Sequence, residues 1–198
     1  MAKTPIDALG PPELLRDIAH VLLTPEQIQQ RVVELGAEIS EAYQGKDLLI
    51  IGVLRGVIFF VADLARAITI PASVDFMSIS RYGPSERTRG VVRLIKDLEE
   101  PIEGRHVLFV EDIIDTGFTL SYILNILRTR HPASLKVCAL LDKQSFRLID
   151  LPIAFRGFQI EDHFVVGYGL DYKQRYRNLP FIGVLKPEVY APPPATPN

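Results

Sequence analysis

The most informative segment of this 198-residue chain reads Val107-Leu108-Phe109-Val110-Glu111-Asp112-Ile113-Ile114-Asp115-Thr116-Gly117-Phe118-Thr119. Its four leading apolar residues predict a buried parallel strand, and residues 120–130 behind it predict a helix. A strand, a loop that contains glycine and threonine, and a helix together form a cradle for a phosphate group. Acidic groups beside such a cradle would repel the phosphate, so they need a further role, which a hydroxylated sugar and a divalent metal would supply.

In spelling and order this segment resembles the signature of the phosphoribosyltransferases, the enzymes that use phosphoribosyl pyrophosphate (PRPP). The run Val-Glu-Asp-Ile-Ile-Asp-Thr-Gly is similar to the hypoxanthine/guanine branch of that family. The resemblance covers residues 48–190, because further family motifs follow in the same order. These motifs are Leu54-Arg55-Gly56, Leu141-Asp142-Lys143, Phe164-Val165, Val166-Gly167-Tyr168-Gly169-Leu170-Asp171-Tyr172 and Tyr176-Arg177-Asn178-Leu179-Pro180.

Apolar runs that alternate with helical patterns predict an α/β fold, with a parallel sheet and helices on both faces. The expected strands cover residues 48–53, 74–80, 91–95, 106–110, 135–141, 153–158 and 164–168, and the expected helices 24–43, 56–68 and 120–130. The resemblance implies the type I phosphoribosyltransferase arrangement. We expect the strands beyond residue 145 and the N-terminal helix to form a small cap, or hood, over the carboxyl edge of the sheet, where ligands bind in open α/β folds.

No internal repeat or second domain is visible, so residues 1–198 are expected to form one phosphoribosyltransferase domain. Residues 1–23 predict an N-terminal arm or a short helix, and the Pro-rich tail, residues 187–198, is expected to be disordered. The first long helix should begin with a capping box, in which Thr24 is the N-cap and Gln27 its partner. Its apolar face consists of Ile28, Val32, Leu35 and Ile39.

Composition narrows the functional classes. A net charge of −2 predicts neither a general nucleic-acid surface nor a membrane surface. The most apolar stretch, residues 48–68, contains Arg55, Asp63 and Arg66, which argues against a transmembrane helix. The first twenty residues lack the apolar core of a signal peptide. With a single cysteine, Cys138, an internal disulfide is excluded, which suits a reducing compartment, and we predict a cytoplasmic protein. Cys138 lies in an apolar run and is expected to pack in the core.

The resemblance transfers family roles to the residues of the 111–119 segment. Thr116-Gly117-Phe118-Thr119, together with Asp115, match the loop that holds the 5′-phosphate of PRPP. Glu111 and Asp112 match the acids that meet the ribose hydroxyls and a Mg²⁺-bound shell. Asp115 also matches the candidate general base, opposite N7 of the purine. The alternatives are a capped helix start without a ligand, and acids that only compensate a helix dipole.

Two further motifs concern the pyrophosphate and the metal. In the family, the loop matched by Leu54, Arg55 and Gly56 holds pyrophosphate and contains a cis peptide that does not involve proline; here it would join Leu54 to Arg55. Arg177 would be a second pyrophosphate contact, and Asp171 the direct ligand of Mg²⁺. The alternative for Leu54–Gly56 is an ordinary turn between strand and helix with a solvated arginine.

The purine site rests on three residues. Lys143 matches the lysine that reads the exocyclic O6, Phe164 an aromatic that stacks on the base, and Val165 a backbone contact to the base. Without the resemblance, a solvated lysine and a core aromatic would be the simpler interpretations.

Residues 81–90 are polar, basic and flanked by glycine, which predicts a mobile loop. The family often has Ser-Tyr where this chain has Arg81 and Tyr82. Tyr82 is kept, so we expect the loop to close and to exclude water from the reaction. Arg81 either adds a phosphate contact or is solvated.

The resemblance implies purine salvage: Mg²⁺-dependent transfer of phosphoribose from PRPP to hypoxanthine or guanine, giving IMP or GMP and pyrophosphate, by a homodimer or a homotetramer. One alternative is the same fold with another base, such as xanthine/guanine or adenine. Another is a regulatory protein of this fold that binds RNA or a transcription partner. Motifs for a P-loop, a serine-hydrolase elbow and a zinc site are missing from the sequence.

Overall fold

The computed structural model describes residues 10–81 and 92–191, and the chain divides into two compact units. The larger unit consists of residues 29–162 and the smaller of residues 1–28 and 163–198. Within the described ranges, no helix is both long and apolar enough to cross a membrane.

The larger unit is built on a six-stranded sheet with the order β4-β3-β2-β5-β6-β7. All neighbouring strands are parallel except the edge pair β3 and β4. The strands are β2 (Leu48–Leu54), β3 (Ala72–Arg81), β4 (Val92–Lys96), β5 (His106–Ile114), β6 (Ser134–Asp142) and β7 (Phe155–Gln159). The predicted α/β class, with a mostly parallel sheet, is therefore confirmed.

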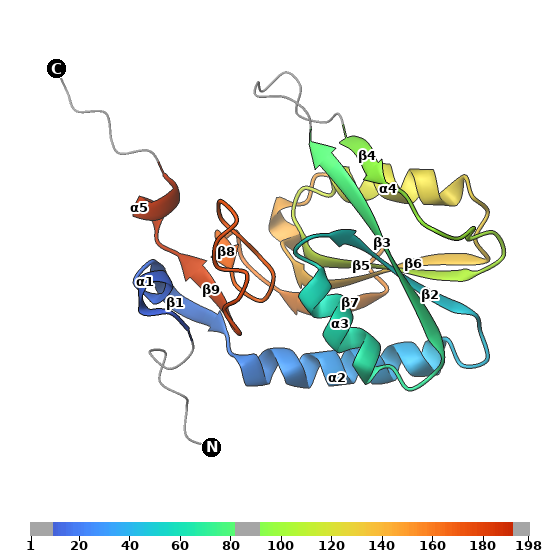
Figure 1. Ribbon diagram of the computed structural model, residues 1–198, viewed down its shortest axis with the longest axis horizontal. Helices are drawn as coiled ribbons and strands as arrows, with labels where there is room; N and C mark the ends of the chain where they lie inside the picture. The colour runs from blue at the N-terminus through green and yellow to red at the C-terminus, as the bar shows by residue number, and fades with distance from the viewer. Residues whose placement is uncertain (1–9, 82–91, 192–198) are drawn as a thin grey trace. The chain divides into compact units, whose positions relative to one another are not determined.

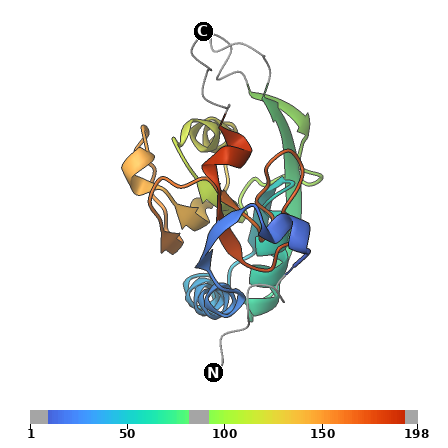
Figure 2. The same cartoon turned by 90° about the vertical axis from the view of Figure 1, so that its left-hand side faces the viewer.

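Three helices cover this sheet: α2 (Pro25–Ala42), α3 (Ile58–Ala67) and α4 (Phe118–Arg128). Figure 1 shows α2 and α3 together on one face and α4 on the other, and Figure 2 agrees. Alternate residues of each strand point to opposite faces. Those on the α4 side form one buried cluster with the helix: Leu49, Ile51, Val107, Phe109, Val137, Ala139, Leu120, Ile123, Leu124 and Leu127.

The start of α2 is the capping box predicted from the sequence. The backbone N–H of Gln27 donates to Thr24 Oγ1 at 3.3 Å, and that of Thr24 donates to Gln27 Oε1 at 2.9 Å. Ile28, Val32, Leu35 and Ile39 are all buried, as predicted for the apolar face.

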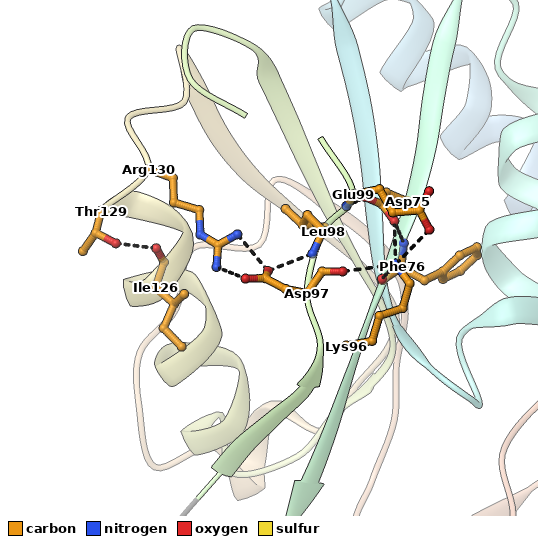
Figure 3. Close-up of polar contacts among 9 residues, drawn as sticks. All are labelled: Asp75, Phe76, Lys96, Asp97, Leu98, Glu99, Ile126, Thr129 and Arg130. Atoms are coloured by element: carbon orange, nitrogen blue, oxygen red, sulfur yellow. Dashed lines mark hydrogen bonds and ion pairs between the residues drawn. The ribbon is translucent and has the colours of Figure 1, made fainter. Parts of the chain in front are cut away.

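Polar contacts at the end of the edge strand β4 and just after it join this segment to β3 and to the residues after α4 (Figure 3). Lys96 Nζ lies 3.2 Å from Asp75 Oδ1 on β3, and the backbone N–H of Glu99 donates to Asp75 Oδ2 at 2.7 Å. Asp97 forms a two-pronged pair with Arg130, at 2.8 Å for each nitrogen. Side chains far apart in sequence thus hold an edge strand that has only one strand neighbour.

The smaller unit has its own antiparallel sheet in the order β1-β9-β8. Its elements are α1 (Pro12–Leu15), β1 (Ile18–Leu23), β8 (Val165–Val166), β9 (Ile182–Leu185) and α5 (Pro187–Tyr190). Its core packs around Tyr176, whose hydroxyl donates to Asp17 Oδ2 at 2.5 Å. The pKa of Tyr176 is raised to about 12, mainly by burial and to a smaller extent by this bond to a carboxylate.

Several expectations from the sequence were wrong. The arm contains the expected short helix, α1, but also a strand, β1, that was not expected. The tail begins with a helix, α5, and β9 was not expected at all. The cap was expected to include all strands beyond residue 145 and the N-terminal helix, but β7 is an edge of the larger sheet and α2 lies mainly in the larger unit. Short strands such as β1 and β9 have little pattern of their own and form because a partner strand is present.

Candidate active site

The predicted residues of the larger unit gather at the carboxyl edge of its sheet. β2, β5 and β6 are adjacent and parallel, so the segments that follow them leave the sheet at the same edge. These segments contain Leu54–Gly56, Asp115–Thr119 and Lys143. From β2 the chain crosses through α3 to β3, and from β5 it crosses through α4 in the opposite direction to β6. The point between β2 and β5 is where open α/β sheets bind ligands.

The loop after β5 leads directly into α4. Asp115 is exposed, Thr116 and Thr119 are half-buried, and Gly117 is the N-cap residue of α4. Among the described residues, no side chain caps this helix. The N–H groups of the first helical turn and the helix dipole attract an anion. The geometry therefore suits the 5′-phosphate assignment of Thr116–Thr119, which stays a prediction.

Gly117 is required by the path of this loop. Its φ is +86°, in the left-handed region that side chains with a Cβ rarely adopt. A Cβ at this position would also lie 3.2 Å from Leu151 Cδ1 and 3.3 Å from Ile149 O. The segment that crowds it also braces the loop, because Leu148 N–H and Ile149 N–H donate to Thr116 O at 3.0 and 3.3 Å.

Glu111 and Asp112 lie inside β5, not after it as predicted, since the strand continues to Ile114. Both side chains are half-buried. The carboxylate of Asp112 accepts the backbone N–H of Ile113 at 2.8 Å. Adjacent strand residues point to opposite faces of a sheet, so the two acids face different sides.

The turn after β2 contains a cis peptide between Leu54 and Arg55, as the resemblance implied. Arg55 and Gly56 belong to this turn, and α3 begins only at Ile58. Gly52 lets the helix start close to the strand, because a Cβ there would lie 2.8 Å from Val57 Cγ1. Turn and helix thus pack directly on β2 at the predicted pyrophosphate position.

Lys143 follows the last residue of β6 and is buried, with 8% of the residue exposed. The interpretation as a solvated lysine is therefore wrong. Its ammonium donates to Asp162 Oδ1 at 2.9 Å, and its backbone N–H donates to Ile114 O at 3.0 Å. The second bond places Lys143 next to the residue that precedes Asp115.

Behind Lys143 lies a buried charge cluster. Asp142 has no exposed surface and forms ion pairs with two arginines. Arg147 Nη2 contacts one carboxylate oxygen, and Arg156 Nε lies 2.8 Å from the other. Arg147 Nη1 also donates to Leu151 O at 3.1 Å. Because Asp142 directly precedes Lys143, this cluster fixes the chain where the lysine leaves the strand.

The remaining predicted residues lie in the smaller unit. Phe164 is 36% exposed and makes two ring contacts, with Tyr190 and Tyr172. Val165, on β8, is buried. Asp171 and Arg177 form an ion pair, with 2.7 Å between Asp171 Oδ1 and Arg177 Nη2.

The second carboxylate oxygen of Asp171 accepts the backbone N–H of Gln174 at 2.8 Å, and Arg177 Nη1 donates to Gly169 O at 2.6 Å. Within the ranges that the structure covers, no three His, Cys, Asp or Glu side chains are grouped so as to hold a metal alone. Mg²⁺ is usually held by one or two carboxylates and by substrate phosphates. Asp171 alone therefore fits a metal that binds together with a phosphorylated substrate.

Two further predictions from the sequence concern the loop that begins at Arg81 and Tyr82 and the single cysteine. Tyr82 lies outside the described residues, and of Arg81 only the backbone is described, as the last residue of β3. Cys138 is fully buried on β6, and burial raises the pKa of its thiol well above the usual range. A protonated thiol in the core is inert, as predicted.

A family model for the phosphoribosyl transferase domain matches residues 22–173. The chain belongs to the phosphoribosyltransferase family. This phosphoribosyltransferase is 54% identical over 180 residues to the hypoxanthine-guanine phosphoribosyltransferase of Mycobacterium avium, covering 88% of this chain and 89% of the relative. It is 52% identical to the Bacillus subtilis enzyme of the same name, over 88% of this chain and 97% of the relative.

A solved structure of a hypoxanthine phosphoribosyltransferase from Staphylococcus aureus is also similar to this phosphoribosyltransferase. The TM-score is 0.87 at 46% sequence identity, covering 91% of this chain and 98% of that chain. The type I phosphoribosyltransferase fold predicted from the sequence is thereby confirmed.

Sequence reasoning missed three features of the site region: Asp162 as partner of Lys143, the two arginines on Asp142, and Tyr190 as partner of Phe164. No local sequence pattern predicts these contacts, because the partners of Lys143 and Phe164 lie 19 and 26 residues away in the chain. The one signal in the sequence was Asp142, which stands next to Lys143 directly after an apolar strand. A carboxylate that is buried at such a position requires cationic partners.

Proposed function

We propose that this protein transfers the 5-phosphoribosyl group of PRPP to N9 of hypoxanthine or guanine, giving IMP or GMP and pyrophosphate. The observation that carries the proposal is the buried ammonium of Lys143, which lies at the same sheet edge as the uncapped start of α4. An anion site and a buried hydrogen-bond donor on one edge fit a phosphorylated sugar and a polar base. The relatives at 52–54% identity carry names with the same activity.

The phosphate and the sugar of PRPP would bind along the β5–α4 connection. Backbone N–H groups of Thr116–Thr119 and the two threonine hydroxyls would donate to the 5′-phosphate. Glu111 and Asp112 would accept hydrogen bonds from the ribose hydroxyls. Both residues are half-buried and lie near the carboxyl end of β5, which leads into this loop.

Departure of pyrophosphate from C1′ needs its growing negative charge to be neutralised. Backbone amides of Leu54–Gly56 and the guanidinium of Arg177 would bind the leaving group. Asp171, with Glu111 and Asp112 in the outer shell, would hold Mg²⁺, which supplies Lewis-acid neutralisation of pyrophosphate when it is bound. Loop residues 81–90, which include Arg81 and Tyr82, would exclude water, which competes with the purine for C1′.

Asp115 would act as the general base. As N9 of the purine bonds to C1′, the base must lose its N7 proton to remain neutral. Asp115 is exposed at the end of β5, so its carboxylate can reach a ligand at this edge. General-base assistance of this kind is typically worth about 10²–10⁴ in rate.

Base recognition would rest on Lys143, Phe164 and Val165. An ammonium donates hydrogen bonds and cannot accept them, so Lys143 favours a 6-oxo over a 6-amino group. This argues against adenine and leaves hypoxanthine, guanine and xanthine. Phe164 would stack on the base, and the backbone of Val165 would bind its edge.

The test is a spectrophotometric assay with PRPP, Mg²⁺ and each purine in turn, with adenine as the matched control. We expect turnover with hypoxanthine and guanine and little with adenine. Turnover with xanthine alone would assign another branch of the family. Absence of turnover with every purine would support a regulatory role. We also propose a cytoplasmic homodimer or homotetramer, which fractionation and light scattering would test.

A further inference from the structure

We propose that Tyr190, on the C-terminal helix α5, is a positioning residue that holds the ring of Phe164 in place for the purine. This inference rests on the proposed function, in which Phe164 stacks on the base. The two rings are stacked, with centroids 4.7 Å apart and planes inclined by 19°. All residues that carry the inference belong to the smaller unit.

The geometry of the pair follows from the chain around it. Leu185, the last residue of β9, donates its backbone N–H to Phe164 O at 2.8 Å. Lys186 then occupies the N-cap position of α5, and Pro187 lies in the first helical turn. Only four residues separate Leu185 from Tyr190, so the helix returns the tyrosine ring directly onto Phe164.

Two contacts hold the start of α5 in place. Lys186 N–H donates to Asp17 O at 2.9 Å, and Lys186 Nζ donates to Arg16 O at 2.6 Å. Val189 of the same helix packs against the buried cluster of the smaller unit. A four-residue helix is unstable alone, and these contacts to the unit supply its stability.

A second ring limits the motion of Phe164 in another direction. Tyr172 meets it edge to face, with 5.5 Å between centroids and planes at 90°. Phe164 and Tyr190 both remain 36% exposed, and neither is a member of the buried core cluster. An aromatic pair that is kept partly open to solvent contributes little to the core but fixes the orientation of an exposed ring.

A fixed ring matters because stacking depends on orientation. Offset-stacked aromatic pairs require a defined centroid separation and a defined inclination. A Phe164 ring that rotates freely would have to be ordered when the purine binds, which costs affinity. Tyr190 removes this cost in advance. PRPP makes no stacking contact, so its binding should not depend on Tyr190.

The test compares three substitutions with the unchanged enzyme. Tyr190→Phe keeps the ring, Tyr190→Leu keeps apolar volume without a planar ring, and Tyr190→Ala removes both. The matched control is Tyr122→Ala, which removes a tyrosine of similar exposure, 42%, from α4. KM for hypoxanthine, KM for PRPP and kcat are measured for each, together with the thermal midpoint of unfolding.

We expect Tyr190→Ala and Tyr190→Leu to raise the purine KM by about 2- to 12-fold, the range of measured aromatic pair contributions. The KM for PRPP should change by less than about twofold, and Tyr190→Phe and Tyr122→Ala should behave like the unchanged enzyme. An unchanged or lowered purine KM in both ring-less variants would overturn the inference, as would an equal rise for both substrates or loss of folding in both. Absence of turnover in the unchanged enzyme is a different result, which rejects the proposed function and this inference with it.

Discussion

The ammonium of Lys143 lies 2.9 Å from Oδ1 of Asp162, and the two side chains differ in exposure. The lysine side chain is 10% exposed and the aspartate side chain 52%. A buried ammonium needs a partner, because its desolvation is otherwise uncompensated. Asp162 fills this role, and its own outer face stays in water. A 6-oxopurine would offer the same ammonium a second acceptor.

Lys143→Ala should therefore raise the KM for hypoxanthine and guanine by orders of magnitude, and the KM for PRPP much less. A site built around one polar contact leaves groups unpaired when that contact is removed. Lys46→Ala serves as the control, because Lys46 is an exposed lysine whose ammonium donates to Ala42 O at 2.7 Å. Equal rises for purine and PRPP would make Lys143 a general electrostatic residue.

Asp115→Asn should lower kcat by about 10²–10⁴ while PRPP affinity changes much less. Asparagine keeps the shape and the hydrogen-bonding reach of aspartate but cannot take up a proton. If Asp115 only caps the loop, asparagine will substitute well and kcat will fall by less than about tenfold. Measuring kcat and the PRPP Kd of the variant separates the two roles.

Removal of Mg²⁺ with excess EDTA should abolish turnover, and added Mg²⁺ should restore it. Asp171→Asn should raise the Mg²⁺ concentration needed for half-maximal rate, because the proposed ligand loses its charge. Asp171 also pairs with Arg177 at 2.7 Å, so the thermal midpoint is measured alongside. Full activity in EDTA would contradict the metal assignment.

Asp142→Asn should destabilise the fold by about 3–5 kcal/mol, because the change leaves the buried guanidinium of Arg147 without its counter-charge. Urea denaturation gives the free energy of unfolding. The matched control is Asp97→Asn, whose pair with Arg130 is 46% and 30% exposed (Figure 3) and should contribute less than about 1 kcal/mol. A similar decrease in the free energy of unfolding in the two variants would show that burial does not make the Asp142 ion pairs more important than the exposed pair.

Asp97 also predicts a pH dependence. Its hydrogen bonds from Arg130 hold the pKa of the carboxyl below its usual range. A lowered folded pKa means that the pair stabilises the fold above the unfolded pKa, about 3.9, and that this contribution is lost as the pH falls through the folded value. The difference in stability between the unchanged protein and Asp97→Asn should thus be present at pH 7 and be lost as the pH falls through the lowered folded pKa. A stability difference that persists after the carboxyl of Asp97 is protonated would show that the substitution acts through packing and not through the charge.

Local patterns were enough to predict most of the larger unit. Burial of Val107–Val110, the loop at Asp115–Gly117 and the capping box at Thr24 all depend on residues within a few positions of one another. Helix period, strand alternation and capping act over that range, so the sequence alone reveals them. The resemblance to a family added the roles of the site residues, and the cis peptide at Leu54–Arg55 agrees with it.

Contacts between distant segments were decided only by the folded chain. Sheet β1-β9-β8 unites strands from both ends of the sequence, and neither β1 nor β9 was expected there. Asp162 and Tyr190 likewise acquire their roles only when folding brings them to Lys143 and Phe164. A short strand or a charged side chain has many possible partners along the chain. The partner that forms is the one that buries its polar groups with their hydrogen bonds satisfied, and this depends on the whole fold.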